Sequence, residues 1–578
     1  MECRLAAQDH PPGAASRGIG EATPGLSVAL ALDRAGRLWG VKHTAHGYWL
    51  EEAGKVEPLA ELEGERSADV VVIGGGYTGL WTAWHLKKLE PGARVVVLEA
   101  GVCGQGPSGR NGGFCNSMWF SLPNMRERWG DEEALAVARA AHDAIDGVEA
   151  FCRDEGVDAW FRRGGYLQVS TAGAHDGVWD DAVGACRELV GPGFDGGRGN
   201  GIWGGDGDGT GRSENLEGDS ENPVGEGGRP ADRPTEVAQA LGAAEVAQRC
   251  ASPAFRGGAY FPDAATVQPA RLALGLRERL RAAGVEIYEH SPVRRLRPDP
   301  ATPATNLFRC SLCLHGAQKE QRSGGSWDGR GVVAETAGGA RVLAGAAVVA
   351  IGGAAKAPRG PLRDSLTVTS SHIVLTEPVP ELLEQIGWTG GECITDSRAL
   401  IDYFRTTPDG RIAFGWGGGR IAMGARLRGR GELDPDVIAA TVARLREYFP
   451  GLAGKRLTHA WGGPIDVSPT HIPIVVPLPG SRSFAAAGYT GNGVGPSHMV
   501  GRALAALALD RSDNYSRLPF VDPSPQRVPP EPFHWVGGEL IRRALTAKEQ
   551  AELTGRHPHP ISSLVSKVPQ LLGFHIGR

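Results

Sequence analysis

The 578-residue sequence lacks several features that would place it in a specialised class. No apolar run reaches the roughly 18 residues that a membrane-spanning helix needs, and the first 25 residues contain no apolar signal core. Its nine cysteines form no regular framework, which is typical of a reducing compartment. We therefore expect a cytoplasmic protein.

Two further absences exclude other functions. Lys and Arg number 61 against 66 Asp and Glu, giving a net charge of −5, and this balance disfavours nucleic-acid binding. Cys310 and Cys313 form a single CxxC pair, without the second pair that a structural zinc site would need. We expect neither a nucleic-acid partner nor a metal.

The sequence does contain a dinucleotide-binding pattern. An apolar run at 70–73 predicts a buried strand, and it leads into Gly74-x-Gly76-x-x-Gly79 and a helical stretch. A second apolar strand, 94–100, contains Glu99, 20 residues beyond Gly79. This order predicts that the turn residues hold a pyrophosphate and that the second strand end binds the adenosine ribose. The turn residues are Gly74, Gly76, Tyr77, Thr78 and Gly79, and the strand-end residues are Glu99 and Ala100.

Two other glycine clusters favour a flavin over a nicotinamide. One spans 108–113, shortly after the ribose-binding strand, and the other spans 488–498 and opens the last long helix of the body. A flavin ring is large and flat, so the backbone must approach it closely. A helix N-terminus at its pyrimidine edge would stabilise the negative charge of the reduced ring.

Several phrases of the sequence resemble one enzyme family. They lie at 71–80, 97–100, 109–113, 161–169, 261–271, 403–415, 461–466 and 488–494. With these phrases the chain resembles the FAD-dependent oxidoreductases of the D-amino-acid oxidase/glycine oxidase superfamily. Within that superfamily it is most similar to the bacterial gamma-glutamylputrescine oxidoreductase-like group.

The resemblance implies an α/β fold with two discontinuous domains. A Rossmann-like FAD-binding domain would comprise 67–125, 265–365 and 455–510. A substrate domain of α+β type, built on an antiparallel sheet, would comprise 126–264 and 366–454. Residues 1–66 are expected to be an N-terminal extension and 511–578 a C-terminal tail. The polar stretches 187–240 and 298–330 are expected to be inserts, the first of them disordered.

The resemblance also implies roles for single residues toward FAD. The loop beside the flavin would be Ser108, Gly109, Arg110, Asn111, Gly112 and Gly113. The backbone of Val293 would meet the adenine, and Gly352 and Gly353 would form the turn after the next strand. The flavin pyrimidine would meet Gly491, Asn492, Gly493 and Val494. Because this last loop has no cysteine, and Cys115 and His498 match no attachment position, we expect FAD to be bound non-covalently.

The implied reaction is oxidation of a C–N bond in a small amine or amino acid. Hydride passes to flavin N5, the resulting imine hydrolyses in water, and O2 or a quinone takes up the electrons. Tyr403 and Arg405 are the candidate catalytic residues, because strand alternation places both on one face. Arg405 could clamp a substrate carboxylate, with a purely structural arginine as the alternative.

Two other functions stay open. One is a quinone-linked FAD dehydrogenase acting on a hydroxy acid or polyol phosphate, and the other is a flavin-binding scaffold without turnover. The C-terminal tail would suit the membrane contact of a quinone-linked dehydrogenase, because 540–548 has apolar residues on one helical side and basic residues on the other. Membrane-surface contact by this segment is the less favoured interpretation, and packing on the protein's own body is the favoured one.

Overall fold

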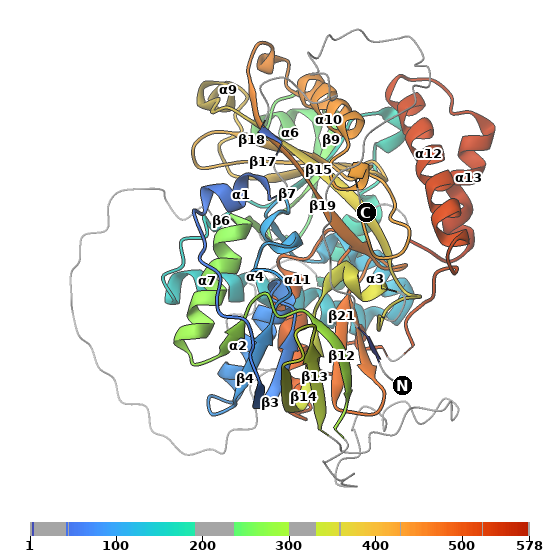
Figure 1. Cartoon of the computed structure of the whole chain (residues 1–578). Coiled ribbons are helices and arrows are strands. Elements are labelled where there is room, and N and C mark those ends of the chain that lie inside the picture. Colours follow the sequence, from blue (N-terminus) through green and yellow to red (C-terminus); the bar gives the residue numbers. More distant parts are fainter. Residues whose placement is uncertain are drawn as a thin grey trace, which may run out of the picture.

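The computed structural model describes residues 3–4, 42–43, 46–190, 236–299, 331–357, 360–427, 429–522 and 524–575. Most of both predicted inserts therefore lies outside the described residues, as do Cys310 and Cys313. Figure 1 shows two sheet-based layers, one below the other, with a pair of helices along one edge.

The lower sheet carries the predicted nucleotide-binding strands. Its parallel part runs in the order β21, β14, β3, β4, β11, and β20 pairs with β21. The first half of β14 also pairs with β13, which leads through β12 to β1. The strands are β1 (Cys3–Arg4), β3 (Glu65–Ile73), β4 (Val95–Leu98), β11 (Glu286–Tyr288), β12 (Val293–Pro298), β13 (Val332–Thr336), β14 (Arg341–Val349), β20 (Ile474–Leu478) and β21 (Ser483–Ala487).

The helices of this layer pack tightly on the parallel strands. The four residues of β4 are all buried, as expected for a parallel strand covered on both faces. Helix α2 (Tyr77–Leu89) lies against α11 (Pro496–Ala508), and a Cβ on Gly501 would come within 2.7 Å of the Trp81 Cβ. Glycine at 501 thus lets the two helices that start at the predicted cofactor loops approach closely. Helices α4 (Asp131–Asp154) and α7 (Pro269–Ala282) complete the layer.

The upper sheet is larger and mixed. Its order is β2, β19, β15, β18, β17, β16, β7, β9, β8, antiparallel except at the β2–β19 and β16–β7 pairs. The strands are β2 (Lys42–His43), β7 (Tyr166–Ser170), β8 (Gln239–Gly242), β9 (Gly257–Phe261), β15 (Thr367–Thr376), β16 (Cys393–Asp396), β17 (Asp402–Thr406), β18 (Ile412–Trp416) and β19 (Leu457–Val467). A third small sheet joins the layers through β5 (Phe114–Asn116), β10 (Ala264–Thr266) and β6 (Arg162–Arg163).

The other helices surround this upper layer or connect it to the lower one. They are α1 (Gly47–Glu52), α3 (Leu122–Trp129), α5 (Asp180–Val190), α6 (Ala243–Arg249), α9 (Pro380–Gln385) and α10 (Pro435–Tyr448). The chain ends in an antiparallel helical hairpin, α12 (Phe533–Leu553) and α13 (Pro560–Leu571), at the edge of the molecule (Figure 1).

The structure corrects some of the expected boundaries. Strand β19 pairs with β15 over its whole length, so the stretch 457–467 belongs to the substrate sheet and not to the FAD-binding domain. Residues 187–190 end helix α5, and the substrate sheet is mixed rather than purely antiparallel. The position of β19 and the parallel β16–β7 pair follow from long-range strand pairing, which the local pattern does not encode.

The predicted N-terminal extension is also part of the body from residue 42 onward. Strand β2 pairs with β19, and Trp49 of α1 is fully buried. The amides of Leu59 and Leu62 donate to the side chains of Glu289 and Ser291. The described residues 42–43 and 46–66 thus contact both layers.

Candidate active site

The turn after β3 requires glycine at two positions. Gly74 has φ +113°, and a Cβ there would overlap the carbonyl oxygen of Ala350 at the end of β14. A Cβ on Gly79 would overlap the carbonyl oxygen of Gly74. Only glycine allows this tight packing of turn, helix and neighbouring strand. The arrangement leaves the first amides of α2 at the strand ends, where they suit a pyrophosphate.

The loop 108–113 lies directly at this helix N-terminus. The backbone N–H of Tyr77 donates to Ser108 Oγ over 2.9 Å, and a Cβ on Gly76 would lie 3.0 Å from the same oxygen. The Tyr77 hydroxyl donates to the carbonyl of Pro269 at the start of α7. The predicted pyrophosphate turn and the predicted flavin loop therefore contact each other directly.

Glu99 occupies the position expected of a ribose-binding carboxylate. Its two oxygens accept hydrogen bonds from the amides of Gly75 (2.6 Å) and Gly101 (2.8 Å), and burial raises the pKa of the carboxyl. The carbonyl of Glu99 accepts the N–H of Ser291, two residues before Val293. The predicted pyrophosphate, ribose and adenine contacts thus lie next to one another.

Two tryptophans hold the flavin loop from outside. The indole N–H of Trp49 donates to the carbonyl of Asn111, and that of Trp461 donates to the carbonyl of Arg110, each over 2.9 Å. The Asn111 side chain also accepts the N–H of Gly113 over 2.7 Å. Hydrogen bonds within the protein therefore hold this loop without a contribution from a cofactor.

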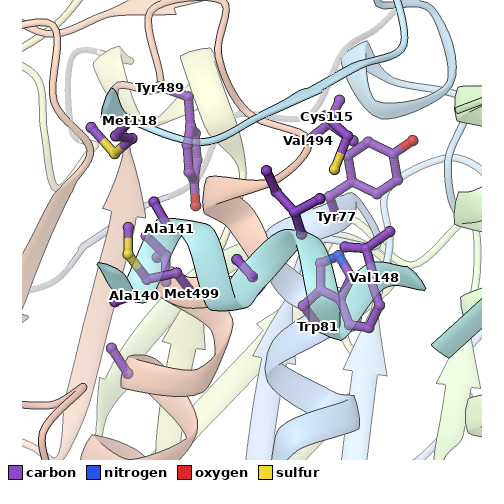
Figure 2. Close-up of a cluster of buried hydrophobic side chains, with 14 of the residues drawn as sticks. Tyr77, Trp81, Cys115, Met118, Ala140, Ala141, Val148, Tyr489, Val494 and Met499 are labelled. Atoms are coloured by element: carbon purple, nitrogen blue, oxygen red, sulfur yellow. The ribbon is translucent and has the colours of Figure 1, made fainter. Parts of the chain in front are cut away.

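The glycine loop at 488–494 contacts the start of helix α2. Thr78 Oγ1 lies 2.7 Å from the Tyr489 hydroxyl, and Figure 2 shows Tyr489, Val494 and Tyr77 around one buried cluster. The side-chain amide of Asn492 donates to the carbonyl of Ser117 over 3.4 Å, and Gly491 has φ +82°. Loops that are some 400 residues apart in the sequence thus converge.

Asp466 joins this loop to a second turn. Its carboxylate accepts the N–H of Gly488 over 2.7 Å, and its carbonyl accepts the N–H of Thr490 over 2.8 Å. A Cβ on Gly353, in the turn after β14, would lie 4.0 Å from the Asp466 Cβ. Burial raises the pKa of the Asp466 carboxyl to about 6.

Tyr403 and Arg405 both face the flavin loop. The Tyr403 ring lies between Gly112 and Gly415, at distances that leave no room for a Cβ on Gly415. Ser371 Oγ donates to the carbonyl of Trp416, and the Tyr403 hydroxyl lies 2.6 Å from Ser371 Oγ. The Tyr403 hydroxyl is therefore the donor in this pair.

Arg405 is buried and hydrogen-bonded to the backbone. Its guanidinium donates to the carbonyls of Gly113 (3.4 Å), Val267 and Thr406 (3.0 Å), and it lies over the Trp49 ring. Burial lowers the pKa of Arg405 to about 10. In this arrangement Arg405 binds the loop itself, and its clamping of a substrate carboxylate stays a prediction.

Sequence reasoning missed Trp49 and Asp466 as site residues. Trp49 lies in the segment predicted to be an extension. The aromatic and apolar residues of His46-Gly-Tyr-Trp-Leu are the local signal that this segment packs on the body. Asp466 ends the phrase Trp-Gly-Gly-Pro-Ile-Asp, one of the phrases on which the resemblance rests. This stretch is predicted to belong to the FAD-binding domain, whereas its strand pairs with the upper sheet. The end of a strand next to a glycine loop is the signal that could have identified it.

The chain belongs to the family described as FAD dependent oxidoreductase, whose model matches residues 69–507. It is a mixed α/β flavoenzyme of this family, and its cofactor is FAD.

Known relatives span nearly the same length. The chain is 26% identical to the gamma-glutamylputrescine oxidoreductase of Escherichia coli K12 over 511 residues, 88% of this chain and 96% of that protein. It is 27% identical to a probable oxidoreductase, OrdL, of Rhizobium meliloti over 518 residues, covering 86% and 95%.

Solved structures share the fold. The glycine oxidase of Geobacillus kaustophilus superposes with a TM-score of 0.54 at 18% identity, covering 79% of this chain and 98% of that one. The L-amino acid deaminase of Proteus myxofaciens superposes with a TM-score of 0.53 at 15% identity, covering 81% and 96%.

The described residues fit FAD on structural grounds. The turn at 74–79 is built so closely that a Cβ at Gly74 or Gly79 would overlap backbone, and Glu99 offers a buried carboxylate beside it. The three predicted cofactor loops also contact one another directly. Backbone amides, a carboxylate and glycine-lined space are what a dinucleotide with a flat ring needs.

Proposed function

We propose that this protein oxidises a C–N bond of a small amine or amino acid with FAD. Membership of the FAD-dependent oxidoreductase family is the observation that carries this proposal. The named relatives support it, because a gamma-glutamylputrescine oxidoreductase aligns over nearly its entire length. When bound, FAD supplies the hydride acceptor, and the protein binds and orients the substrate.

Tyr403 is the residue we assign to the substrate amine. The Tyr403 hydroxyl donates its hydrogen to Ser371 Oγ. A lone pair of the Tyr403 oxygen is therefore left to accept an N–H of the amine. Burial raises the pKa of Tyr403 well above its ordinary value, so the phenol stays neutral. A neutral acceptor of this kind orients an amine without holding it as a cation.

Asp466 is the residue we assign to proton transfer at the site. It lies in the partly exposed end of β19, between the Gly353 turn and the 488–494 loop. With a pKa of about 6, its carboxyl can exchange a proton near neutral pH, whereas an ordinary Asp cannot. It would take up the proton that an ammonium substrate loses before oxidation.

We also propose that FAD is held non-covalently. Cys115 is fully buried, and burial raises the pKa of its thiol, which disfavours the reactive thiolate. The ring of His498 packs against Trp81 and His85, on the α2–α11 side of the loop. Denaturation in acid should release the yellow colour from the protein, and colour that stays with the precipitate would contradict this proposal.

The reaction itself is tested by anaerobic reduction of the holoenzyme. A panel of diamines, their acylated derivatives and amino acids should include at least one compound that bleaches the visible flavin absorbance. Matched hydroxy acids and polyol phosphates are the control panel. Bleaching by that control panel alone would favour the quinone-linked dehydrogenase instead. Comparing the yield of peroxide in air with the rate at which a soluble quinone is reduced then identifies the electron acceptor.

A further inference from the structure

The C-terminal hairpin concentrates the exposed apolar surface of the protein. Of ten large apolar side chains exposed among the described residues, eight lie between Phe533 and Leu572. Figure 1 shows α12 and α13 side by side at the periphery, away from the predicted cofactor loops. Monomeric proteins seldom gather exposed apolar side chains in this way without a binding role.

Helix α12 is attached to the body through its polar side. Glu539 accepts the N–H of Ile421 (2.9 Å), Glu549 accepts that of Leu400 (3.0 Å), and Arg542 donates to the carbonyl of Gly418 (3.3 Å). The opposite side is apolar, with spacings of three and four residues that define one helical stripe, and it is exposed: Phe533, Val536 and Leu540. Ala544 and Leu545, on the apolar side expected for 540–548, are buried against the body, whereas Leu540 is 56% exposed.

Helix α13 also exposes apolar side chains. Ser566 and Pro569 are buried. Of the apolar residues that recur at helical spacing, Ile561, Leu564 and Leu571 are exposed, and Val568 is half-buried. Ile561 and Leu564 are 66% and 65% exposed. Both helices thus expose several large apolar side chains, although Ala544 and Leu545 of α12 are buried, and this exposure is unfavourable in water unless another surface covers it.

The charge around this apolar surface has one sign. The three acidic residues of the hairpin are all engaged at the body or within it, as Glu539 and Glu549 above and Glu552 with Lys548 and His175. The exposed charged side chains between 540 and 570 are basic: Arg543, Arg556 and Lys567. This local positive charge contrasts with the net charge of −5 for the whole chain.

We propose that the outer face of the α12–α13 hairpin docks on the surface of an anionic lipid bilayer. Apolar side chains enter the interface, while Arg543, Arg556 and Lys567 contact lipid headgroups. No helix in the described part of the chain is long and apolar enough to cross a membrane, so the contact is peripheral. A symmetric dimer through this face would bring two basic faces together, with no exposed acid of the hairpin to pair them, and is disfavoured.

Vesicle flotation of the full-length holoenzyme tests the proposal. Vesicles of phosphatidylcholine containing phosphatidylserine should carry the protein upward, and phosphatidylcholine alone should carry much less. Substituting Val536→Ser, Leu540→Ser and Leu564→Ser together should lower partitioning at least about tenfold. Substituting Arg543→Gln and Lys567→Gln should lower it about 30-fold on the anionic vesicles, and high salt should remove that difference.

Matched controls separate docking from unfolding. Val178→Ser changes an exposed apolar residue outside the hairpin, and Lys55→Gln changes an exposed cation near α1, so neither should alter flotation. All variants should keep their melting temperature and FAD content. The proposal is overturned if the wild type ignores both vesicles or if the triple Ser variant still floats. It is also overturned if sedimentation shows that this face mediates a dimer and not lipid binding.

Discussion

Trp49 and Trp461 meet edge to face, with ring centroids 6.0 Å apart and an interplanar angle of 83°. Trp49 lies in helix α1, and Trp461 lies in strand β19 of the upper sheet. Their indole N–H groups bind consecutive carbonyls, Asn111 and Arg110, of the flavin loop. The pair thus couples the N-terminal segment and the substrate sheet to the cofactor site.

Trp49→Phe should weaken FAD binding. The substitution keeps an aromatic ring but removes the hydrogen bond to Asn111, leaving a carbonyl in a protected site without its donor. A neutral hydrogen bond contributes about 0.5–1.5 kcal/mol net, so the Kd for FAD should rise about three- to tenfold. Flavin fluorescence during titration of the apoprotein measures this.

Trp388→Phe is the matched control for that experiment. Trp388 is also buried, and its indole donates to the carbonyl of Glu392 in the core of the upper layer. Its loss should lower the melting temperature to a similar degree without changing the Kd for FAD. Equal weakening of FAD binding by both variants would mean that Trp49 acts only through global stability.

Glu99→Gln should weaken FAD binding more strongly. The carboxylate accepts two backbone N–H groups, from Gly75 and Gly101, and an amide would have to turn its NH2 toward one of them. Hydrogen bonds to a charged group contribute about 1.5–3 kcal/mol, so we expect the Kd to rise about 10- to 100-fold. Glu90→Gln, on the exposed end of α2 where Glu90 pairs with Arg511, should leave the Kd unchanged.

The nucleotide-binding half of the fold was predictable because its signals are local. The strand at 70–73, the turn at 74–79 and the acid at 99 lie within one βαβ unit, where periodicity and glycine spacing define the structure. Helix α4 likewise has a local signal in the sequence, since its apolar stripe extends over many turns.

The substrate side was less predictable because its pairing is long-range. Nothing local in 457–467 distinguishes a strand of one sheet from a strand of the other, and only pairing with β15 decides it. The orientation of helix α12 was not predictable for a related reason. An amphipathic pattern gives the relative position of the two helical sides, but tertiary contacts of Glu539, Arg542 and Glu549 decide which side faces inward.

Arg405→Ala distinguishes two roles for this arginine. If it positions the loop, as its bonds to the carbonyls of Gly113 and Val267 favour, the variant should lose FAD affinity about tenfold or more. If it clamps a substrate carboxylate, KM for an acidic substrate should rise while FAD binding is retained. Arg456→Ala, at an exposed pair with Glu377, is the control. Unchanged FAD affinity together with unchanged kinetics would exclude both roles.

Tyr403→Phe should lower kcat/KM and leave FAD bound. The variant keeps the ring between Gly112 and Gly415 but removes the oxygen that we assign to the substrate amine. Loss of one neutral hydrogen bond predicts a decrease of about three- to tenfold, measured by steady-state kinetics at saturating acceptor. Tyr260→Phe, whose hydroxyl donates to the carbonyl of Gly164, should not change kcat/KM.

Asp466→Asn should change both the pH–rate profile and the pH dependence of stability. Because burial raises the Asp466 pKa from 3.8 to about 6, the folded protein keeps this proton over a range where the unfolded chain has lost it. The wild type should therefore lose stability, by at most about 3 kcal/mol, as pH rises from about 4 to 6.

The amide variant should lack this slope in melting temperature, since Asn does not titrate. If Asp466 accepts the substrate proton, kcat/KM of the wild type should also rise with pH through a pKa near 6, and this limb should disappear in the variant. Asp409→Asn, at an exposed turn, controls for general charge effects. A limb near 6 that persists in Asp466→Asn would assign it to another group or to the substrate, whereas loss of the stability slope alone would leave Asp466 a structural carboxyl that holds Gly488 in place.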